Sequence, residues 1–315
     1  MLKSRRVFMK DMATISLLAP YAIPFDRLSK WNQAAEPIDV HIFSKHLQFL
    51  AIQDAAEIAA ELGFQGLDIT VRPHGHVLPE HVKSDLPQAI RAVNNAGLTC
   101  DMITTNISDA NNALDKDIIK SAAAQDIKYY RSNWYRFTQA WSFEKSLNYY
   151  QEKIRLLAEL NKEYGIIGCY QNHAGTGIGS SFWEVKKIIE TADPMYFGVQ
   201  YDVRHAVVEG GRSWTNGLEL LKDHIKTIVL KDFKWEKAGD RWRLVNVPIG
   251  EGMVDFNTFF KLLKHYGLNP PASLHLEYPL GGAEKGKRKL SVDAQVVFKA
   301  MKKDLKSVRR LWKNA

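Results

Sequence analysis

The sequence predicts an α/β protein built as a (β/α)8 TIM barrel, a single domain that follows an N-terminal segment. Short β-rich apolar runs alternate eight times with longer amphipathic helical patterns. Several of these helical patterns end in glycine directly before the next strand, at Gly97, Gly165 and Gly267. The 315 residues also accommodate the roughly 250 that such a barrel needs. An open doubly wound sheet is the main alternative.

Each predicted element is short and well bounded. The predicted strands are 38–43, 66–71, 98–103, 128–132, 166–171, 197–202, 227–232 and 273–278. The predicted helices are 53–62, 86–96, 115–125, 143–164, 183–191, 214–224, 256–266 and 293–311. In the first helix, apolar residues recur at three- and four-residue spacing until Gly63 ends it. No linker or composition break interrupts residues 36–315, which we expect to form one domain.

Residues 1–35 are expected to form an export signal of the twin-arginine type. The string from Ser4 to Lys10 reads Ser-Arg-Arg-Val-Phe-Met-Lys and resembles the bacterial twin-arginine motif, and a mildly apolar stretch follows over 12–19. An ordinary amphipathic N-terminal segment is the alternative. Because proteins of this type cross the membrane folded, the prediction places the barrel in the periplasm or otherwise outside the cytoplasm.

Composition and charge exclude several classes of protein. Hydrophobic residues make up 45% and charged residues 25%, as in an ordinary globular protein. The formal net charge is +8, but residues 1–35 hold six basic and two acidic residues. The remaining +4 is too little to indicate a nucleic-acid partner. No apolar run reaches the ~20 residues of a membrane span, and two cysteines cannot form a disulfide framework.

Polar side chains gather where the predicted strands end, which in such barrels is the side of the active site. Alternation along a strand places every second residue on the same face. On the last strand the apolar residues share one face, so His275 and Glu277 are expected to point into the barrel. The same parity directs Gln171, Asp202 and Lys231 inward. Charged groups inside a barrel are costly unless paired or bound, which indicates a functional site.

These residues belong to strings that resemble a known family. The strings are Gln-Asn-His at 171–173, Tyr-Asp-Val-Arg-His-Ala at 201–206, Leu-Lys-Asp at 230–232, Pro-Ile-Gly-Glu-Gly-Met-Val-Asp-Phe at 248–256 and Leu-Glu-Tyr at 276–278. They resemble the xylose-isomerase-like barrels, a family of sugar (phosphate) isomerases and epimerases that includes keto-sugar 3-epimerases and inosose dehydratases. The resemblance covers about residues 38–310, and the string at 248–256 is its most specific part.

The resemblance implies a divalent metal held by Glu, Asp, His and Glu, with the two glutamates moving the proton next to the substrate carbonyl. The matching positions here are Gln171, Asp202, Val229 and Glu277, so two of the four depart from the pattern. Gln171 offers a carbonyl oxygen but is no base, and Val229 offers no ligand.

Three interpretations remain open. A metal (Mn, Zn, Mg or Fe) binds through Asp202 and Glu277 with Gln171 or a histidine such as His275; or the Lys231 ammonium stands in for the cation; or the barrel binds a sugar without turnover.

The candidate residues divide by role. The catalytic candidates are Glu277, Lys231 and Gln171, and the candidate metal ligands are Asp202, Glu277, Gln171 and His275. The candidate substrate contacts are His205, His173, Arg72, His46, Arg131, Trp134 and Trp235. Aromatic rings suit the apolar C–H faces of sugars. For each candidate the alternative is structural: an ion pair, a buried core histidine, a solvent-exposed rim residue or core packing.

The sequence therefore predicts an exported sugar isomerase or epimerase that acts by proton transfer next to a carbonyl of a small carbohydrate, with or without a divalent metal. The alternatives are a keto-sugar lyase or dehydratase of the same fold and a carbohydrate-binding barrel without activity. No nucleic-acid partner and no membrane span are expected, and the oligomeric state, including a homo-oligomer, stays open.

Overall fold

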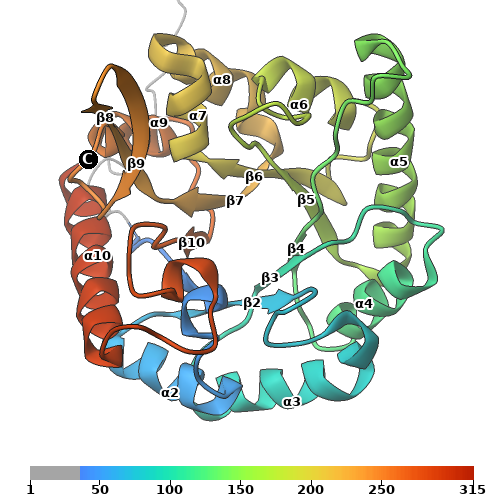
Figure 1. The fold of residues 1–315 in the computed structure, drawn as a ribbon. Coiled ribbons are helices and arrows are strands. Elements are labelled where there is room, and N and C mark those ends of the chain that lie inside the picture. Colours follow the sequence, from blue (N-terminus) through green and yellow to red (C-terminus); the bar gives the residue numbers. More distant parts are fainter. Residues whose placement is uncertain (1–35) are drawn as a thin grey trace, which may run out of the picture. The chain divides into compact units, whose positions relative to one another are not determined.

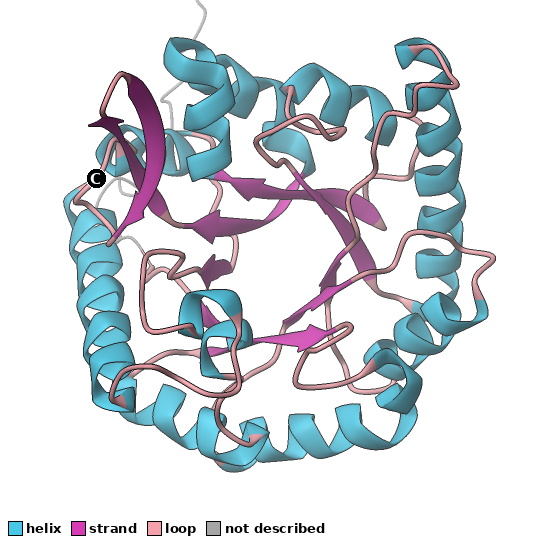
Figure 2. Ribbon diagram, in the orientation of Figure 1, coloured by secondary structure: helices cyan, strands magenta, loops and turns pink. Residues whose placement is uncertain are grey.

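Eight parallel strands close into a barrel, with helices around it, in the computed structural model, which describes residues 36–315 (Figure 1). Around the barrel the strands follow the order β1-β2-β3-β4-β5-β6-β7-β10, and β10 pairs with β1 to close it. Figure 2 shows the strands enclosed by the ring of helices. The predicted (β/α)8 barrel is thereby confirmed. The predicted export signal, residues 1–35, lies outside the described residues.

The barrel strands are β1 (Val40–Phe43), β2 (Gly66–Val71), β3 (Met102–Thr105), β4 (Tyr129–Arg131), β5 (Ile167–Gln171), β6 (Phe197–Asp202), β7 (Ile225–Leu230) and β10 (Ala272–Leu274). The α-helices are α2 (Ile52–Leu62), α3 (Val82–Asn95), α4 (Ala113–Ala123), α5 (Phe143–Tyr164), α6 (Phe182–Ile189), α7 (Val203–Gly210), α8 (Trp214–Leu221), α9 (Phe256–His265) and α10 (Ala294–Asn314). Within residues 36–315, no helix combines the length and apolar character needed to cross a bilayer.

Several elements differ from the sequence prediction, including the third strand, which runs over Met102–Thr105 rather than 98–103. The loop expected after the seventh strand is an antiparallel hairpin of β8 (Asp232–Ala238) and β9 (Arg241–Val247). Helix α7 begins directly after β6, where no helix was predicted; it is only eight residues long, and the Asp202 side chain caps it by accepting from the His205 N–H. The last barrel strand ends at Leu274, so His275 and Glu277 lie just beyond it.

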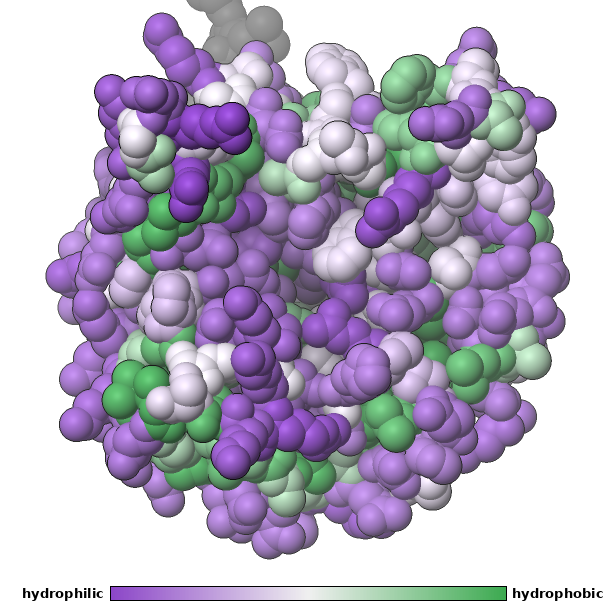
Figure 3. All heavy atoms as spheres, viewed as in Figure 1, coloured by the Kyte–Doolittle hydropathy of each residue, from purple (hydrophilic) through white to green (hydrophobic). Residues whose placement is uncertain are grey.

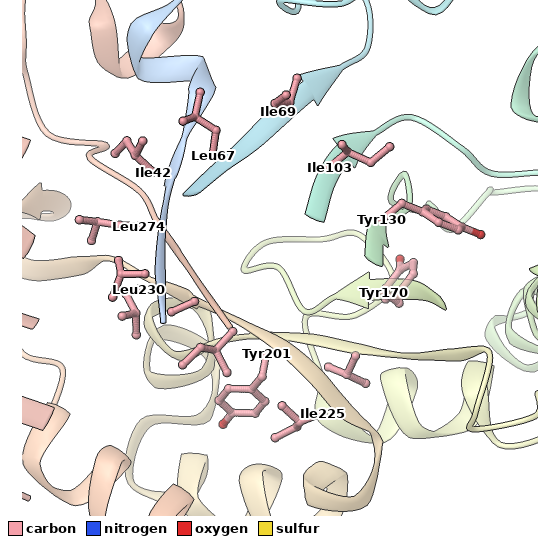
Figure 4. Packing of buried hydrophobic residues seen from close by; sticks show 14 of the residues in the cluster. Ile42, Leu67, Ile69, Ile103, Tyr130, Tyr170, Tyr201, Ile225, Leu230 and Leu274 are labelled. Carbon is pink, nitrogen blue, oxygen red and sulfur yellow. The ribbon is translucent and has the colours of Figure 1, made fainter. Parts of the chain in front are cut away.

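The apolar core fills the space between the strands and the helices. Ile42, Leu67 and Leu274 take part in it from β1, β2 and β10 (Figure 4). Tyr130 and Tyr201 are fully buried, and Tyr130 donates to Asn161 of α5 at 3.1 Å. This is the outward face of the strands, which leaves the alternate residues to fill the barrel interior.

The barrel interior is partly polar. Asp68 of β2 is 1% exposed and accepts from Ser273 Oγ at 2.6 Å and from Thr104 Oγ1 at 2.9 Å. Burial raises the pKa of Asp68, although these hydrogen bonds oppose the shift. The strands therefore carry a hydrogen-bonded polar layer below the mouth of the barrel.

The string at 248–256 forms a tight turn around Asp232. The Asp232 carboxylate accepts from the backbone N–H groups of Gly250, Gly252 and Val254 at 3.0, 2.9 and 3.1 Å. A Cβ on Gly252 would lie 2.3 Å from Asp232 Oδ1, so only glycine fits there. The most specific string of the sequence is thus a structural clamp on the chain between β9 and α9.

Candidate active site

Four neighbouring strands of the barrel wall bring four polar side chains together at the mouth of the barrel, and three of these side chains are charged. Gln171 ends β5, Asp202 ends β6, and Lys231 and Glu277 follow β7 and β10. Parallel strands end on the same side of the barrel, so residues distant in sequence meet there. We call Gln171, Asp202, Lys231 and Glu277 the mouth group. In Figure 3, hydrophilic residues predominate on the face drawn.

Asp202 is the most enclosed member of the mouth group, with no exposed surface. Its Oδ2 accepts from Gln171 Nε2 at 2.7 Å and lies 2.9 Å from Lys231 Nζ. Its Oδ1 accepts from the backbone N–H of His205 at 3.0 Å. A buried carboxylate is tolerated only when it is paired and hydrogen-bonded. Asp202 meets this condition with three donors.

Lys231 joins the two carboxylates of the mouth group. It is 3% exposed and lies two residues beyond Val229. Its Nζ lies 2.9 Å from Asp202 Oδ2, 2.8 Å from His205 Nε2 and 3.9 Å from Glu277 Oε2. The ammonium therefore lies between the two carboxylates, closer to the buried Asp202 than to Glu277 at the rim.

Glu277 is the carboxylate of the mouth group that reaches solvent, with 27% of its side chain exposed. Its Oε1 accepts from Lys45 Nζ at 3.1 Å. Burial acts to raise the pKa of Glu277, but Lys231, His275 and Lys45 outweigh it and hold that pKa well below its usual value. Glu277 is therefore ionised at neutral pH and open to a ligand.

His275 lies beside Glu277, inside the barrel. Its ring stacks on Phe43 at 4.2 Å, its Nε2 lies 3.1 Å from Ser273 Oγ, and its Nδ1 lies 3.8 Å from Glu277 Oε1. Burial lowers the pKa of His275 to about 4, so the ring is neutral near pH 7. Since Ser273 also donates to Asp68, hydrogen bonds connect Asp68 of the barrel interior to His275, whose Nδ1 has no hydrogen-bond partner among the described residues.

Two further histidines border the mouth group. The rings of His173 and His205 lie 4.0 Å apart, and burial lowers the pKa of both. His205 Nε2 faces Lys231 and its Nδ1 lies 2.9 Å from Arg204 Nη1. A neutral imidazole carries one N–H, so only one of these two contacts is a hydrogen bond. The His205 ring is held between two cations.

The opposite side of the mouth carries two arginines. Arg131 is 2% exposed, donates from Nη2 to the Thr105 carbonyl at 3.0 Å and lies 4.1 Å from the Trp134 ring. Among the described residues, its Nε and Nη1 have no hydrogen-bond partner. Burial and the nearby Arg72 lower the pKa of Arg131 to about 9. Arg72 itself lies 5.4 Å from the Phe43 ring.

A cavity of about 420 Å³ lies beside His173 and Trp134, whose rings are 4.6 Å apart. Its lining is Trp134, Tyr135, Arg136, Phe137, His173, Ala174, Thr176, Gly177 and Ile178. A larger groove of about 540 Å³ lies against α10 and is lined by surface lysines such as Lys302 and Lys306. Of the two, the first cavity is the better candidate for a ligand site, because aromatic rings and a histidine that contacts His205 line it.

Two predicted contact residues are not among the hydrogen-bond partners of the mouth group in the described part of the chain, although the His46 ring lies 6.2 Å from that of His275. His46 has no exposed surface; its Nδ1 faces the Ala283 carbonyl at 3.2 Å, and its Nε2 accepts from the Leu276 N–H at 3.0 Å. Both ring nitrogens therefore contact the backbone, a buried structural role that differs from the rim contact or solvent exposure expected for His46. Trp235 lies on the β8–β9 hairpin and is 40% exposed.

Asn246 of β9 is a site neighbour that the sequence did not indicate. Its Oδ1 accepts from Arg204 Nη2 at 2.8 Å, and its Nδ2 donates to the Glu277 carbonyl at 3.2 Å. These contacts join the base of the hairpin to the rim of the barrel. No local signal could have found Asn246, because a loop was expected there.

The mouth group does not fit a divalent cation. The matching position on β7 is Val229, which has no donor atom, and Gln171 turns its N–H toward Asp202. The Lys231 ammonium already lies within 4 Å of oxygens from both Asp202 and Glu277. A cation placed among these oxygens would meet positive charge and N–H donors rather than lone pairs.

One other group among the described residues has the composition of a cation site. Oxygens of Asp39 and Asp101 and a ring nitrogen of His41 lie within 4.8 Å of one another. These residues lie just before or at the start of β1 and β3, at the opposite end of the barrel. Asp101 is already paired with Lys128 at 2.9 Å. This group is remote from the chemistry expected at the mouth.

The fold and the mouth group define a (β/α)8 barrel with acid–base residues at the carboxyl ends of its strands. The chain belongs to the xylose isomerase-like TIM barrel family, whose model matches residues 56–294. It is 30% identical over 127 residues to an inosose dehydratase from Bacillus licheniformis, which covers 36% of this chain and 41% of that protein. The chain thus matches about two fifths of the length of this relative.

Solved structures share the fold at low sequence identity. The IOLI protein with a bound zinc atom superposes with a TM-score of 0.68 at 16% identity, covering 87% of this chain and 99% of that one. The 3-keto-D-glucoside 4-epimerase YcjR from E. coli, in apo form, gives a TM-score of 0.62 at 12% identity, covering 84% and 97%. These likenesses confirm the barrel.

Proposed function

We propose that the chain is an enzyme of the isomerase, epimerase or lyase range that moves a proton next to a carbonyl of a small carbohydrate. The observation that carries this proposal is Glu277: an ionised carboxylate, partly exposed, between the ammonium groups of Lys231 and Lys45. The C–H bond next to the carbonyl breaks, its proton moves to Glu277, and the electron pair moves to the carbonyl oxygen. The related dehydratase and epimerase support the same range of reactions.

A lyase is the form of this activity that the mouth group favours. Epimerisation by two bases needs a second proton acceptor on the opposite face of the substrate. The position that would supply it holds Gln171, whose amide donates to Asp202 and is not a base near neutral pH. Glu277 removes the proton and then returns it to the hydroxyl on the next carbon, which leaves as water while the carbonyl re-forms and a C=C bond joins the two carbons. This sequence needs only one carboxylate. The similarity to inosose dehydratases agrees with this choice.

The aromatic cavity is the proposed seat of the sugar ring. Trp134 and His173 line it and lead toward His205 and the mouth group. Apolar faces of sugar rings pack on such aromatic rings, and the flanking polar groups fix their orientation.

Exchange of substrate hydrogen with deuterated water tests the proposal across a panel of keto-sugars and oxidised glycosides. The wild-type chain should exchange the hydrogen next to the carbonyl, and Glu277→Gln should lower the rate by ~100-fold or more. Glu251→Gln is the matched control, because Glu251 pairs with Lys303 on the outside of the barrel. An unchanged rate in Glu277→Gln contradicts the assignment. Sugar binding without any exchange by the wild type would favour the binding-only alternative.

Export by the twin-arginine route is part of the proposal. It rests on the sequence Ser-Arg-Arg-Val-Phe-Met-Lys over residues 4–10. Cell fractionation of the wild type and of the Arg5→Lys/Arg6→Lys variant provides the test. Periplasmic wild type and cytoplasmic variant are expected; the same compartment for both would refute it.

A further inference from the structure

We propose that the Lys231 ammonium takes the place and the task of the family's divalent cation, binding the substrate carbonyl oxygen so that this barrel turns over without a metal. The inference rests on the proposed function and names the electrophile of the same site. In the proton-transfer step the C–H electron pair forms the C=C bond of the enolate, the π electrons of the carbonyl move to its oxygen, and the proton ends on Glu277. Lys231 stabilises the resulting oxyanion by hydrogen bonding. No other reactant is needed.

The position of Lys231 suits it to replace a cation. Lys231 Nζ lies 2.9 Å from Asp202 Oδ2 and 3.9 Å from Glu277 Oε2, so one positive charge serves two carboxylates that the family pattern assigns to a metal. The β7 residue on the same face, Val229, is an apolar side chain with no exposed surface. Without a ligand at that position, the lysine tip is free to approach Asp202.

Lys231 also has more N–H donors than its protein partners use. An ammonium group has three N–H bonds. Asp202 and His205, at 2.9 and 2.8 Å, take at most two of them. Glu277 Oε2, at 3.9 Å, is too far for a full hydrogen bond. One N–H on the Glu277 side of Lys231 is therefore available to a substrate oxygen.

The Lys231 ammonium is held in place before a substrate binds. Asp202 fixes the ammonium from below and is itself fixed by Gln171 and the His205 N–H. A charge held rigidly in an enclosed site stabilises a developing oxyanion far better than one in water. The substitution of Gln for Glu at position 171 fits this arrangement, because an amide N–H supports the shared Asp202 oxygen where a second carboxylate would repel it.

Metal binding tests the proposal without any substrate. The Asp39→Asn/Asp101→Asn background removes the cation-type group at the far end of the barrel. In that background, calorimetry with Mn²⁺, Zn²⁺ and Co²⁺ should give no site tighter than millimolar, and elemental analysis after metal-supplemented expression should give less than about a tenth of an equivalent. About one equivalent of metal that is lost in a further Asp202→Asn variant would overturn the proposal.

A restored variant provides the positive control. Gln171→Glu/Val229→His/Lys231→Met rebuilds the Glu-Asp-His-Glu set, and it should bind about one Co²⁺ with the absorption of a protein-bound ion. Circular dichroism verifies its fold; if it is unfolded, the measurements on the parent background still decide the question. A folded restored variant that binds no metal would contradict the geometric argument, because the parent's lack of metal would then have another cause.

Turnover supplies the second readout. Chelator treatment should leave wild-type exchange within about twofold, and Lys231→Met should lower it by ~100-fold or more with a larger effect on kcat than on KM. Lys303→Met, an exposed lysine paired with Glu251, is the matched control. Loss of exchange on chelation, restored by one metal, would overturn the proposal. No exchange by the untreated wild type would instead remove the proposed function, and the metal titrations would stand by themselves.

Discussion

Replacing Lys231 by methionine removes the ammonium that lies 2.9 Å from Asp202 and leaves that carboxylate buried with no exposed surface. Removing one partner of a buried ion pair costs ~3–5 kcal/mol, because the other charge stays behind unpaired. Asp202 retains the donors Gln171 and His205 N–H, so we expect Lys231→Met to lower the free energy of unfolding by the smaller figure, about 3 kcal/mol.

A double-mutant cycle isolates the pair. Asp202→Asn should cost less than Lys231→Met, because Lys231 keeps contacts with His205 and Glu277. The combined variant should be less destabilised than the sum of the two, with a coupling energy of ~1–3 kcal/mol. Urea unfolding followed by circular dichroism measures all four proteins. Additive effects, with coupling below about 0.5 kcal/mol, would show that the two charges do not stabilise one another and refute the reasoning.

Two further predictions concern the frame of the barrel. Asp304 of α10 has no exposed surface and accepts from Tyr278 Oη at 2.9 Å, and burial raises its pKa from 3.8 to about 7. Between pH 4 and 7 the native state therefore keeps this proton, whereas the unfolded chain releases it. The contribution of Asp304 to the free energy of unfolding is complete below pH 4 and is lost as the pH rises through 7. At ~1.4 kcal/mol per pKa unit this loss is about 4 kcal/mol. Asp304→Asn should remove this loss, because asparagine does not titrate. Between pH 5 and 8 the free energy of unfolding of the variant should therefore rise relative to that of the wild type. A difference that stays constant over this range would contradict the raised pKa of Asp304. Asp232→Ala should lower the unfolding free energy by ~1–3 kcal/mol, since it leaves the buried N–H group of Val254 and the partly exposed N–H groups of Gly250 and Gly252 without their acceptor; thermal unfolding with an unchanged midpoint would contradict the clamp.

The sequence predicted the barrel and the inward faces of its strands with few errors, for a local reason. Alternation of apolar and polar residues fixes which side chains face the helices, as the contact of Tyr278 with Asp304 shows. The boundaries were less accurate: the last strand ends at Leu274, and the loop after β7 forms a hairpin. Pairing between two exposed, polar segments leaves no strong periodic signal.

The candidate site was predicted in part. Parity placed Gln171, Asp202, Lys231 and Glu277 on inward faces, and the structure brings their side chains together. Parity could not place His46, because its position beside Lys45 in the sequence indicates a place at the rim equally well. The ring instead turns inward and contacts the backbone of Ala283 and Leu276.

By itself, the sequence determined the strand–helix order, the polar residues at the strand ends and the absence of a β7 ligand at Val229, because these depend on neighbours along the chain. Only the tertiary structure decided that the Lys231 ammonium reaches both Asp202 and Glu277, and that Asn246 contacts the Glu277 backbone. These distances follow from barrel closure and from side-chain rotamers selected by partners 26 to 46 residues away in the chain. The competition among such partners for one buried charge has no counterpart in the local sequence.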